Sequence, residues 1–389
     1  MRRDELPPLH GPIVCVVGAR PNFIKIAPIL RAFAAHPSAP PTLLVHTGQH
    51  YDAAMSDRLF ADLNLPRPDI NLEVGSGTHA VQTAEIMRRF EPVLDEHAPS
   101  CVLVVGDVNS TLACTLVAVK KGVPAVHVEA GLRSFDRSMP EEINRVLTDQ
   151  IADVLYTTER AAEANLAREG VDSSRVRFVG NVMIDSLLAN RKMARLPRET
   201  VQLAGGSSAL VEDSCGYGVV TLHRPSNVDL PDRLGSLLAV LGEIADRLPL
   251  VFALHPRTQA NVSRFGLTHL LADRRIVVLP PQGYLEMLGL MSGAALVLTD
   301  SGGIQEETTA LGVPCLTLRE NTERQITVEQ GTNTLVGTAR EAILSAVDAI
   351  LAGSGKRGRV PELWDGQASE RIAADLIEWL AGRRAKAKV

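Results

Sequence analysis

The sequence lacks the features that mark several large classes of protein. No apolar run is long enough to cross a bilayer, and the first twelve residues are polar, without the apolar core of a signal peptide. Lys and Arg together number 40 against 45 Asp and Glu, so the net charge is −5 and no excess of basic residues indicates nucleic-acid binding. We therefore expect a protein that binds neither nucleic acid nor membranes.

Cysteine is scarce and scattered. The five cysteines are odd in number and include no CxxC pair, so they fit neither a disulfide framework nor a zinc site. GxGxxG, Walker and GxSxG motifs are also missing, which leaves NAD without support. The pattern predicts buried free thiols, a reducing cytoplasm and no metal. The cysteines are Cys15, Cys101, Cys114, Cys215 and Cys315.

What the sequence does contain is an alternation of short apolar runs with amphipathic helical patterns, which is typical of βαβ units and a parallel sheet. A chain of 389 residues is too long for one compact core. The pattern fades over 196–216 and then restarts, which predicts two doubly wound domains, 13–195 and 196–367, after a flexible tail over 1–12. Strands are predicted at 13–18, 42–47, 101–106, 125–128, 154–157, 176–179, 219–222, 250–254, 275–279, 295–298 and 314–318.

One strand-to-helix turn is the most informative local feature. The apolar run from Ala294 to Thr299 ends at Asp300, Ser301, Gly302 and Gly303, where a helical pattern begins. A glycine turn at a helix start presents unpaired N–H groups to an anion, most often a phosphate. Glu306 or Glu307, one turn later, suits a ribose hydroxyl. An ordinary βα turn is the alternative, but the adjoining carboxylates favour a nucleotide.

Candidate site residues in the first half also follow predicted strands. Arg20 and Lys25 come after the first strand and are suitable partners for phosphate oxygens; a solvated basic pair is the alternative. Asp107 follows the strand over 101–106, where it is either a cleft residue or the N-cap of the next helix.

Three further glutamates lie at the starts of predicted elements or inside them. Glu129 falls in a buried strand, where a carboxylate is disfavoured unless it is paired or functional, and an ion pair with Arg133 is the structural alternative. Glu141 and Glu142 follow a proline in a first helical turn. Because they face different directions, at most one of them is expected to line a cleft.

Two histidines end strands of the second half. His223 follows the strand over 219–222, and His255 follows the strand over 250–254. A single histidine at a strand end is more often structural than catalytic. Two of them, beside the Ser301–Gly303 turn, indicate the lining of a cleft, because parallel strands bring their carboxyl ends to one edge of the sheet.

Taken in order along the chain, these residues form a recognisable set. The ordered motifs resemble the non-hydrolysing UDP-N-acetylglucosamine 2-epimerases over nearly the whole chain. The motifs are Gly18-Ala19-Arg20-Pro21, Thr47-Gly48-Gln49-His50, Gly106-Asp107, His127 to Arg133, Pro140-Glu141-Glu142-x-Asn144-Arg145, Gly180-Asn181, His223-Arg224, Asp300 to Glu307, Thr322-Glu323-Arg324 and Asp365 to Ile372.

The resemblance implies a GT-B type fold of two Rossmann-like domains, with the active site in the interdomain cleft and the closing helix (368–389) crossing back to the first domain. It implies conversion of UDP-GlcNAc to UDP-ManNAc without a cofactor, through elimination of UDP to 2-acetamidoglucal and re-addition. We expect a cytoplasmic homodimer.

The resemblance also assigns roles to the candidate residues. Asp107, Glu129 and Glu141 become the acid/base carboxylates, and His223 with Arg20 stabilises the leaving phosphate. Ser301, Gly302 and Gly303 hold phosphate, and Glu307 holds the ribose. From their positions, Lys25 and His255 complete the substrate site.

Some positions depart from the family pattern and leave alternatives open. Asn22, Ser226 and Gln325 replace the usual Glu, Glu and Pro of three motifs. Alternatives are a hydrolysing 2-epimerase that releases ManNAc, a 2-epimerase of a modified UDP-N-acetyl sugar, a GT-B glycosyltransferase and a non-catalytic nucleotide-sugar sensor. Many bacterial relatives bind a second, activating UDP-GlcNAc. The acid at Asp52 and the uncharged stretch Gly75–Thr78 predict that this regulatory site is absent here.

Overall fold

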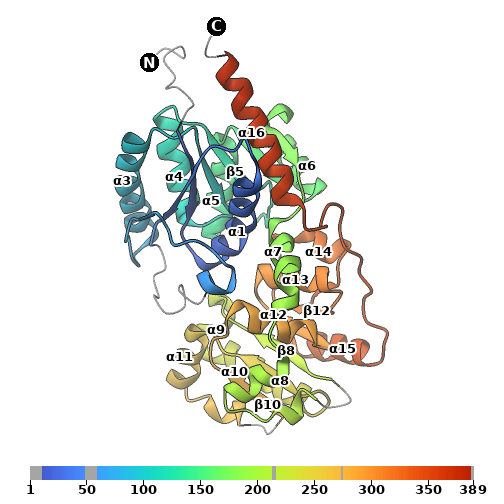
Figure 1. The fold of residues 1–389 in the computed structure, drawn as a ribbon. Helices are drawn as coiled ribbons and strands as arrows, with labels where there is room; N and C mark the ends of the chain where they lie inside the picture. Colours follow the sequence, from blue (N-terminus) through green and yellow to red (C-terminus); the bar gives the residue numbers. More distant parts are fainter. Residues whose placement is uncertain (1–10, 49–58, 213–215, 273–274, 387–389) are drawn as a thin grey trace. The chain divides into compact units, whose positions relative to one another are not determined.

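The computed structural model of the protein describes residues 11–48, 59–212, 216–272 and 275–386. The chain divides into two compact units. Unit 1 consists of Met1–Ser186 together with Glu362–Val389, and unit 2 consists of Leu187–Pro361. In both units helices alternate with parallel strands, so each is a Rossmann-like α/β unit, as in GT-B type proteins (Figure 1).

Unit 1 contains a parallel sheet of seven strands in the order β3-β2-β1-β4-β5-β6-β7. Every residue of β1, β4, β5 and β6 is buried. Helices cover both faces of such a sheet, which is why its strands read as nearly continuous apolar runs. The strands are β1 (Ile13–Val17), β2 (Thr42–His46), β3 (Ile70–Asn71), β4 (Cys101–Val105), β5 (Ala125–Ala130), β6 (Val154–Thr157) and β7 (Val176–Phe178).

The closing helix of the chain, α16, belongs to unit 1 and packs against α1 (Figure 1). Its first turn is fixed by Asp185, whose carboxylate accepts hydrogen bonds from the N–H groups of Ala368 (3.2 Å) and Ser369 (2.7 Å). The unit 1 helices are α1 (Arg20–Ala35), α3 (His79–His97), α4 (Asn109–Lys120), α5 (Pro140–Ile151), α6 (Arg160–Arg168), α7 (Val182–Asn190) and α16 (Ala368–Lys386).

Unit 2 contains a parallel sheet of six strands in the order β10-β9-β8-β11-β12-β13. Its apolar core includes Leu222, Leu250, Phe252 and Leu298, all nearly or fully buried. The strands are β8 (Gly218–Thr221), β9 (Leu250–Ala253), β10 (Ile276–Leu279), β11 (Leu296–Thr299), β12 (Cys315–Thr317) and β13 (Asn333–Leu335).

Proline sets the start of several unit 2 helices. The first residue of α8, α9, α10 and α11 is proline, whose fixed φ suits a first turn and whose missing N–H costs no hydrogen bond there. The helices are α8 (Pro197–Leu203), α9 (Pro225–Val228), α10 (Pro231–Ala245), α11 (Pro256–Arg264), α12 (Tyr284–Ser292), α13 (Gly302–Leu311), α14 (Gln325–Glu329) and α15 (Arg340–Leu351); α7 extends into unit 2.

The eleven strands predicted from the sequence are all present, and the α/β prediction is confirmed. Two short strands, β3 and β13, were not predicted. The units divide after Ser186 and again before Glu362, earlier than the predicted 195/196 and 367/368. The reason is that the first division falls inside α7, where a continuous helical pattern gives no loop signal, while part of the 196–216 stretch forms α8.

Four cysteines lie in the described part of the chain, and all four are free and buried. Burial raises the pKa of the Cys101 thiol to about 12 and that of Cys315 to about 11, and it raises the pKa of Cys15 and Cys114 as well. Cys215 lies outside the described residues. Within them, no helix has both the length and the apolar character needed to traverse a membrane.

Candidate active site

The turns at the carboxyl ends of β1 and β4 form the first part of the site. The strand order of unit 1 reverses between these two strands, and α/β sheets bind ligands at such a point. The turn after β1 packs tightly against α4. A Cβ added to Gly18 would lie only 2.1 Å from Oγ of Ser110. Only glycine fits there, and Arg20 follows as the first residue of α1.

Asn22 fixes this turn. Its Oδ1 accepts hydrogen bonds from the N–H groups of Gly18 and Ala19, both at 3.0 Å, and its Nδ2 donates to the Val105 carbonyl oxygen at 3.0 Å. From the first turn of α1, the asparagine that replaces the family's usual glutamate therefore bonds back to the two N–H groups before the helix and ties the end of β1 to the end of β4. No charge is needed for that role.

Lys25 and Glu129 form a buried ion pair across unit 1. Nζ of Lys25 lies 2.7 Å from Oε1 of Glu129, and both side chains are at most 5% exposed. The structural alternative, a pair between Glu129 and Arg133, is wrong: Arg133 pairs with Asp149 (2.7 Å) and Glu169 (2.6 Å). The chain turns at Gly131 (φ 79°) before Arg133, so the two side chains leave the strand in different directions.

A second buried network lies behind Glu129. His127 makes two 2.7 Å hydrogen bonds, from Nδ1 to the Asp149 carboxylate and from Nε2 to the carbonyl oxygen of Gly106. Both nitrogens of this fully buried ring are therefore held by hydrogen bonds. Burial alone would raise the pKa of Asp149, but His127 and Arg133 outweigh burial and hold that pKa below its usual value. This network fixes the Gly106 turn that leads to Asp107.

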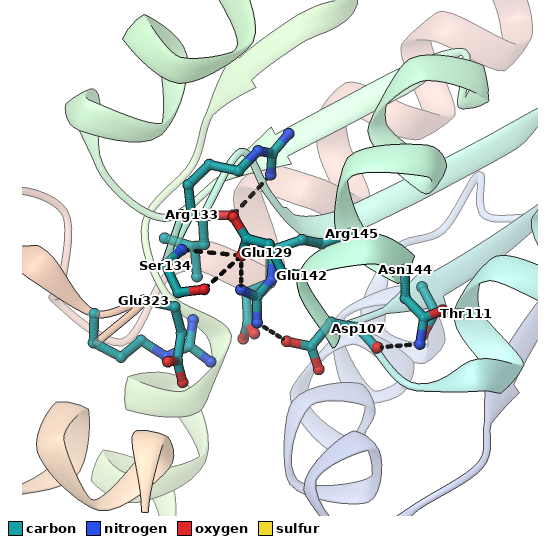
Figure 2. Close-up of polar contacts among 12 residues, drawn as sticks. Asp107, Thr111, Glu129, Arg133, Ser134, Glu142, Asn144, Arg145 and Glu323 are labelled. Atoms are coloured by element: carbon teal, nitrogen blue, oxygen red, sulfur yellow. Dashed lines mark hydrogen bonds and ion pairs between the residues drawn. The ribbon is translucent and has the colours of Figure 1, made fainter. Parts of the chain in front are cut away.

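Asp107 is held by Arg145 of α5. Figure 2 shows the Arg145 guanidinium between two carboxylates, bonded to Asp107 through one terminal nitrogen and to Glu142 through the other. The carbonyl oxygen of Asp107 accepts a hydrogen bond from Nδ2 of Asn144 at 2.9 Å. The N-cap alternative for Asp107 is wrong, because the N-cap of α4 is Val108 and no side chain caps that helix.

The two adjacent glutamates of α5 point in different directions, as predicted. Glu142 is buried and accepts hydrogen bonds from the N–H and hydroxyl of Ser134 and from the N–H of Phe135, at 2.9–3.0 Å, so it braces the loop before α5 (Figure 2). Glu141 instead lines a cavity of about 220 Å³ with His79, Asn109 and others. The remaining lining residues are Ser76, Gly77, Gln82, Val108, Pro140 and Asn144.

Candidate residues of unit 2 also lie where the strand order reverses, which in this sheet is between β8 and β11. Asp300, fully buried at the end of β11, accepts hydrogen bonds from the N–H groups of His223 and Arg224 and from Nδ2 of Asn227, at 3.0–3.1 Å. Nδ1 of His223 lies 3.1 Å from the same carboxylate. Although burial opposes it, this hydrogen bonding lowers the pKa of Asp300. The His223 ring is thereby oriented through Nδ1.

His255 lies beside His223. The ring centroids are 5.4 Å apart, and Nδ1 of His255 accepts a hydrogen bond from the N–H of Arg257 at 3.2 Å, which makes His255 the N-cap of α11. The structure thus brings the two predicted histidines together.

The start of α13 carries the predicted phosphate turn. Ser301 is its N-cap residue and makes no side-chain cap hydrogen bond, and Gly302 is the first helical residue. A Cβ on Gly302 would lie 2.5 Å from Oε1 of Glu323, a carboxylate that pairs with Arg319 at 2.9 Å and Arg224 at 3.7 Å. The Glu323 carboxylate, with its arginine partners, therefore lies beside this helix start, where glycine leaves room for it.

The two glutamates of α13 also have different surroundings. Oε2 of Glu306 lies 3.4 Å from Nε of Arg324, and both side chains are buried. Glu307 is 5% exposed and lies beside Tyr284; burial, with the Glu307 carboxylate, raises the pKa of that tyrosine. Among the residues that the structure describes, no cluster of His, Cys, Asp and Glu is arranged to hold a metal ion.

Sequence reasoning gave no role to three residues that organise these sites: Arg145, Asp149 and Asp300. Each is a charged side chain that is almost fully buried, so each needs partners. That signal is the one used for Glu129, and it could have singled out Asp300 directly after a buried strand. Of the predicted regulatory stretches, residues 49–52 lie outside the described part of the chain.

This chain is similar to known proteins over most of its length. A family model described as UDP-N-acetylglucosamine 2-epimerase matches residues 33–377. A UDP-N-acetylglucosamine 2-epimerase of Methanocaldococcus jannaschii is 43% identical over 360 residues, 92% of this chain and 96% of that protein. A UDP-2,3-diacetamido-2,3-dideoxy-D-glucuronate 2-epimerase of Pseudomonas aeruginosa is 42% identical over 94% of this chain and 99% of that protein.

A solved structure extends the similarity to three dimensions. The crystal structure of the M. jannaschii UDP-GlcNAc 2-epimerase in complex with UDP-GlcNAc and UDP matches with a TM-score of 0.86 and 42% identity. The match covers 94% of this chain and 99% of that one.

Proposed function

Because the chain belongs to the UDP-N-acetylglucosamine 2-epimerase family, we propose that it interconverts UDP-GlcNAc and UDP-ManNAc without hydrolysing them. The observation that carries the proposal is the placement of the carboxylates. Asp107 and Glu129 lie at the carboxyl edge of the unit 1 sheet, each beside a cation. Glu141 lines a cavity that Val108 and Asn109, at the start of α4, also line.

The chemistry requires such groups. The C2 proton of the sugar is not next to a carbonyl, so it cannot be removed to give an enolate. The C1–O bond to UDP breaks as the C2 proton leaves, which yields 2-acetamidoglucal and UDP. UDP then adds back at C1 while a proton returns to the opposite face of C2. Acid/base groups for both faces are needed, and Asp107, Glu129 and Glu141 supply three carboxylates.

Departure of UDP needs compensation for the charge that develops on its diphosphate. We assign this role to His223, oriented by Asp300, and to Arg20 at the start of α1. Ser301, Gly302 and Gly303 hold a phosphate at the start of α13, and Glu307 holds the ribose. Lys25 and His255 complete the site, Lys25 through its ion pair with Glu129.

A second candidate substrate is a 2,3-diacetamido uronate. The P. aeruginosa relative named for that sugar is about as similar to this chain as the M. jannaschii relative named for UDP-GlcNAc, at 42% against 43% identity. Both substrates share the UDP and the 2-acetamido group on which the mechanism depends, so the choice concerns only the groups at C3 and C6. Comparing kcat/KM for the two sugars decides it.

Turnover in D₂O is expected to place deuterium at C2 of both epimers, because the elimination exchanges that proton with solvent. The measurement is a time course of ¹H NMR spectra with UDP-GlcNAc and no added cofactor. Retention of the C2 proton through epimerisation would contradict elimination. Free ManNAc and UDP as the main products would identify a hydrolysing enzyme instead, and acceptor-dependent loss of sugar would identify a glycosyltransferase.

We also expect hyperbolic kinetics in UDP-GlcNAc, and reverse epimerisation of UDP-ManNAc with no lag. Among the described residues that line the cavity beside Glu141, none is Lys or Arg, so this surface offers no charge-assisted bond to a second diphosphate. Each such bond is worth about 1.5–3 kcal/mol. Initial rates over a range of substrate concentrations test this; a sigmoidal curve, or UDP-ManNAc inert until UDP-GlcNAc is added, would contradict it.

A further inference from the structure

Glu129 has an unusual backbone for a residue inside a strand. Its φ is +76°, a left-handed conformation that residues with a side chain rarely adopt. It is the extra residue of a bulge in β5: Val128 pairs with Tyr156 of β6 and Ala130 with Thr157, and Glu129 is left between them. Such bulges re-aim a side chain, and here the side chain reaches Lys25. Because this backbone conformation is strained, other contacts in the fold must stabilise it.

The carboxylate of Asp149 contacts the chain on both sides of the bulge. Oδ1 accepts from Nδ1 of His127 at 2.7 Å, two residues before Glu129, and Oδ2 accepts from the N–H of Gly131 at 3.0 Å, two residues after it. Asp149 is fully buried on α5, and Arg133 lies 2.7 Å from Oδ2.

Gly131 is fixed from its other side as well. Its carbonyl oxygen accepts a hydrogen bond from Nδ2 of Asn165 at 2.9 Å, and a Cβ at this position would lie 2.6 Å from the carbonyl oxygen of Ala162. Gly131 therefore has little freedom to shift, and the hydrogen bond between His127 and Asp149 fixes the chain on the other side of the bulge.

We propose that Asp149 is a positioning residue: it clamps both sides of the Glu129 bulge and so holds the Glu129 carboxylate in its reactive place. The catalytic consequence rests on the proposed function, but the clamp itself does not. Asp149→Ala tests it, because it removes both carboxylate oxygens. Neither Nδ1 of His127 nor the N–H of Gly131 then keeps its partner, and both sides of the clamp open.

The first measurement is the epimerisation rate. Asp149→Ala is expected to lower kcat by about 10²-fold, the usual effect of a small misplacement of a reacting group, and to leave the Kd for UDP unchanged. The matched control is Glu169→Gln, which removes the other carboxylate on Arg133 without touching the bulge and should keep kcat near that of the wild type. An unchanged kcat for Asp149→Ala, or an equal loss in the control, would overturn the proposal.

The second measurement is independent of activity. Glu129→Gly should melt about 2–4 °C above Glu129→Ala, because glycine adopts the left-handed conformation without strain. Both variants remove the ion pair between Lys25 and Glu129, so its loss does not contribute to the difference between their melting temperatures. In an Asp149→Ala background the advantage of glycine should vanish, since an unclamped bulge relaxes.

The outcomes separate the two proposals. If Glu129→Ala is as stable as Glu129→Gly, the bulge is not strained, and this holds even if Asp149→Ala does not fold. An equal advantage of Glu129→Gly in both backgrounds shows that Asp149 does not hold the bulge. A wild-type protein with no epimerase activity refutes the proposed function, whereas the melting comparison still decides the clamp.

Discussion

Replacing Asp107 with Asn, Glu129 with Gln or Glu141 with Gln is expected to lower kcat about 10²–10⁴-fold, the range usual for loss of an acid/base group. Each change keeps the size of the side chain and removes its ability to carry a proton. Glu129→Gln also leaves Lys25 without its charged partner, whereas Arg145 keeps its ion pair with Glu142 in Asp107→Asn. The measurement is steady-state epimerisation of UDP-GlcNAc.

Binding of UDP provides the internal control, because the groups assigned to the nucleotide lie mostly in unit 2. The Kd for UDP should change little in the three variants. Glu85→Gln is a matched surface control, since Glu85 pairs with exposed Arg88 and such pairs contribute little. If Glu129→Gln melts at a lower temperature but retains its kcat, the pair with Lys25 serves the fold and Glu129 is not catalytic.

Asp300→Asn is expected to lower kcat/KM for UDP-GlcNAc by about 10²–10³-fold, the scale for losing an oriented group at a developing charge. The carboxylate accepts from the N–H groups of His223 and Arg224 and from Asn227, and an amide would turn its NH₂ toward one of these donors. The His223 ring would lose its orienting partner at Nδ1. His223→Ala should give a similar loss, and the double variant should lose little more, because the two residues act as a unit.

The same variant should change the acid stability of the protein. The pKa of Asp300 is lowered in the folded state from its ordinary value of 3.8, so the ionised group stabilises the fold above pH 3.8. That contribution is lost as the pH falls below 3.8 and through the folded-state value. Unfolding midpoints measured across this range should therefore fall less steeply for Asp300→Asn than for the wild type. Asp348→Asn, which removes an exposed pair with Arg247, is the control.

The positions of the strands could be predicted because a parallel sheet needs apolar runs of a fixed length. The predicted strands are all found, whereas β3 (Ile70–Asn71) and β13 (Asn333–Leu335) are too short and too polar to stand out. The division inside α7 could not be predicted either, since a helix that belongs to two units has no break in its pattern.

For the site, sequence reasoning found which residues matter better than it found what they contact. Helical spacing correctly separated Glu141 from Glu142. The predicted partner of Glu129, Arg133, was wrong. The true partner, Lys25, lies 104 residues away in the chain, and spacing along the sequence could suggest only the nearby Arg133. Roles for Arg145 and Asp300 depend likewise on contacts between distant segments, which only the folded sheet brings together.

The buried thiols give each unit its own built-in reporter of opening. Only a thiolate reacts with an alkylating reagent, and burial keeps Cys101 and Cys315 protonated at neutral pH, with pKa values of about 12 and 11. Labelling must therefore wait until the surrounding strand separates from its neighbours. Labelling of unit 1 is measured at Cys15, Cys101 and Cys114, and labelling of unit 2 is measured at Cys315. Mass spectrometry of the labelled peptides, in a background with Cys215 replaced, would then show whether the nucleotide slows the opening of one unit or of both.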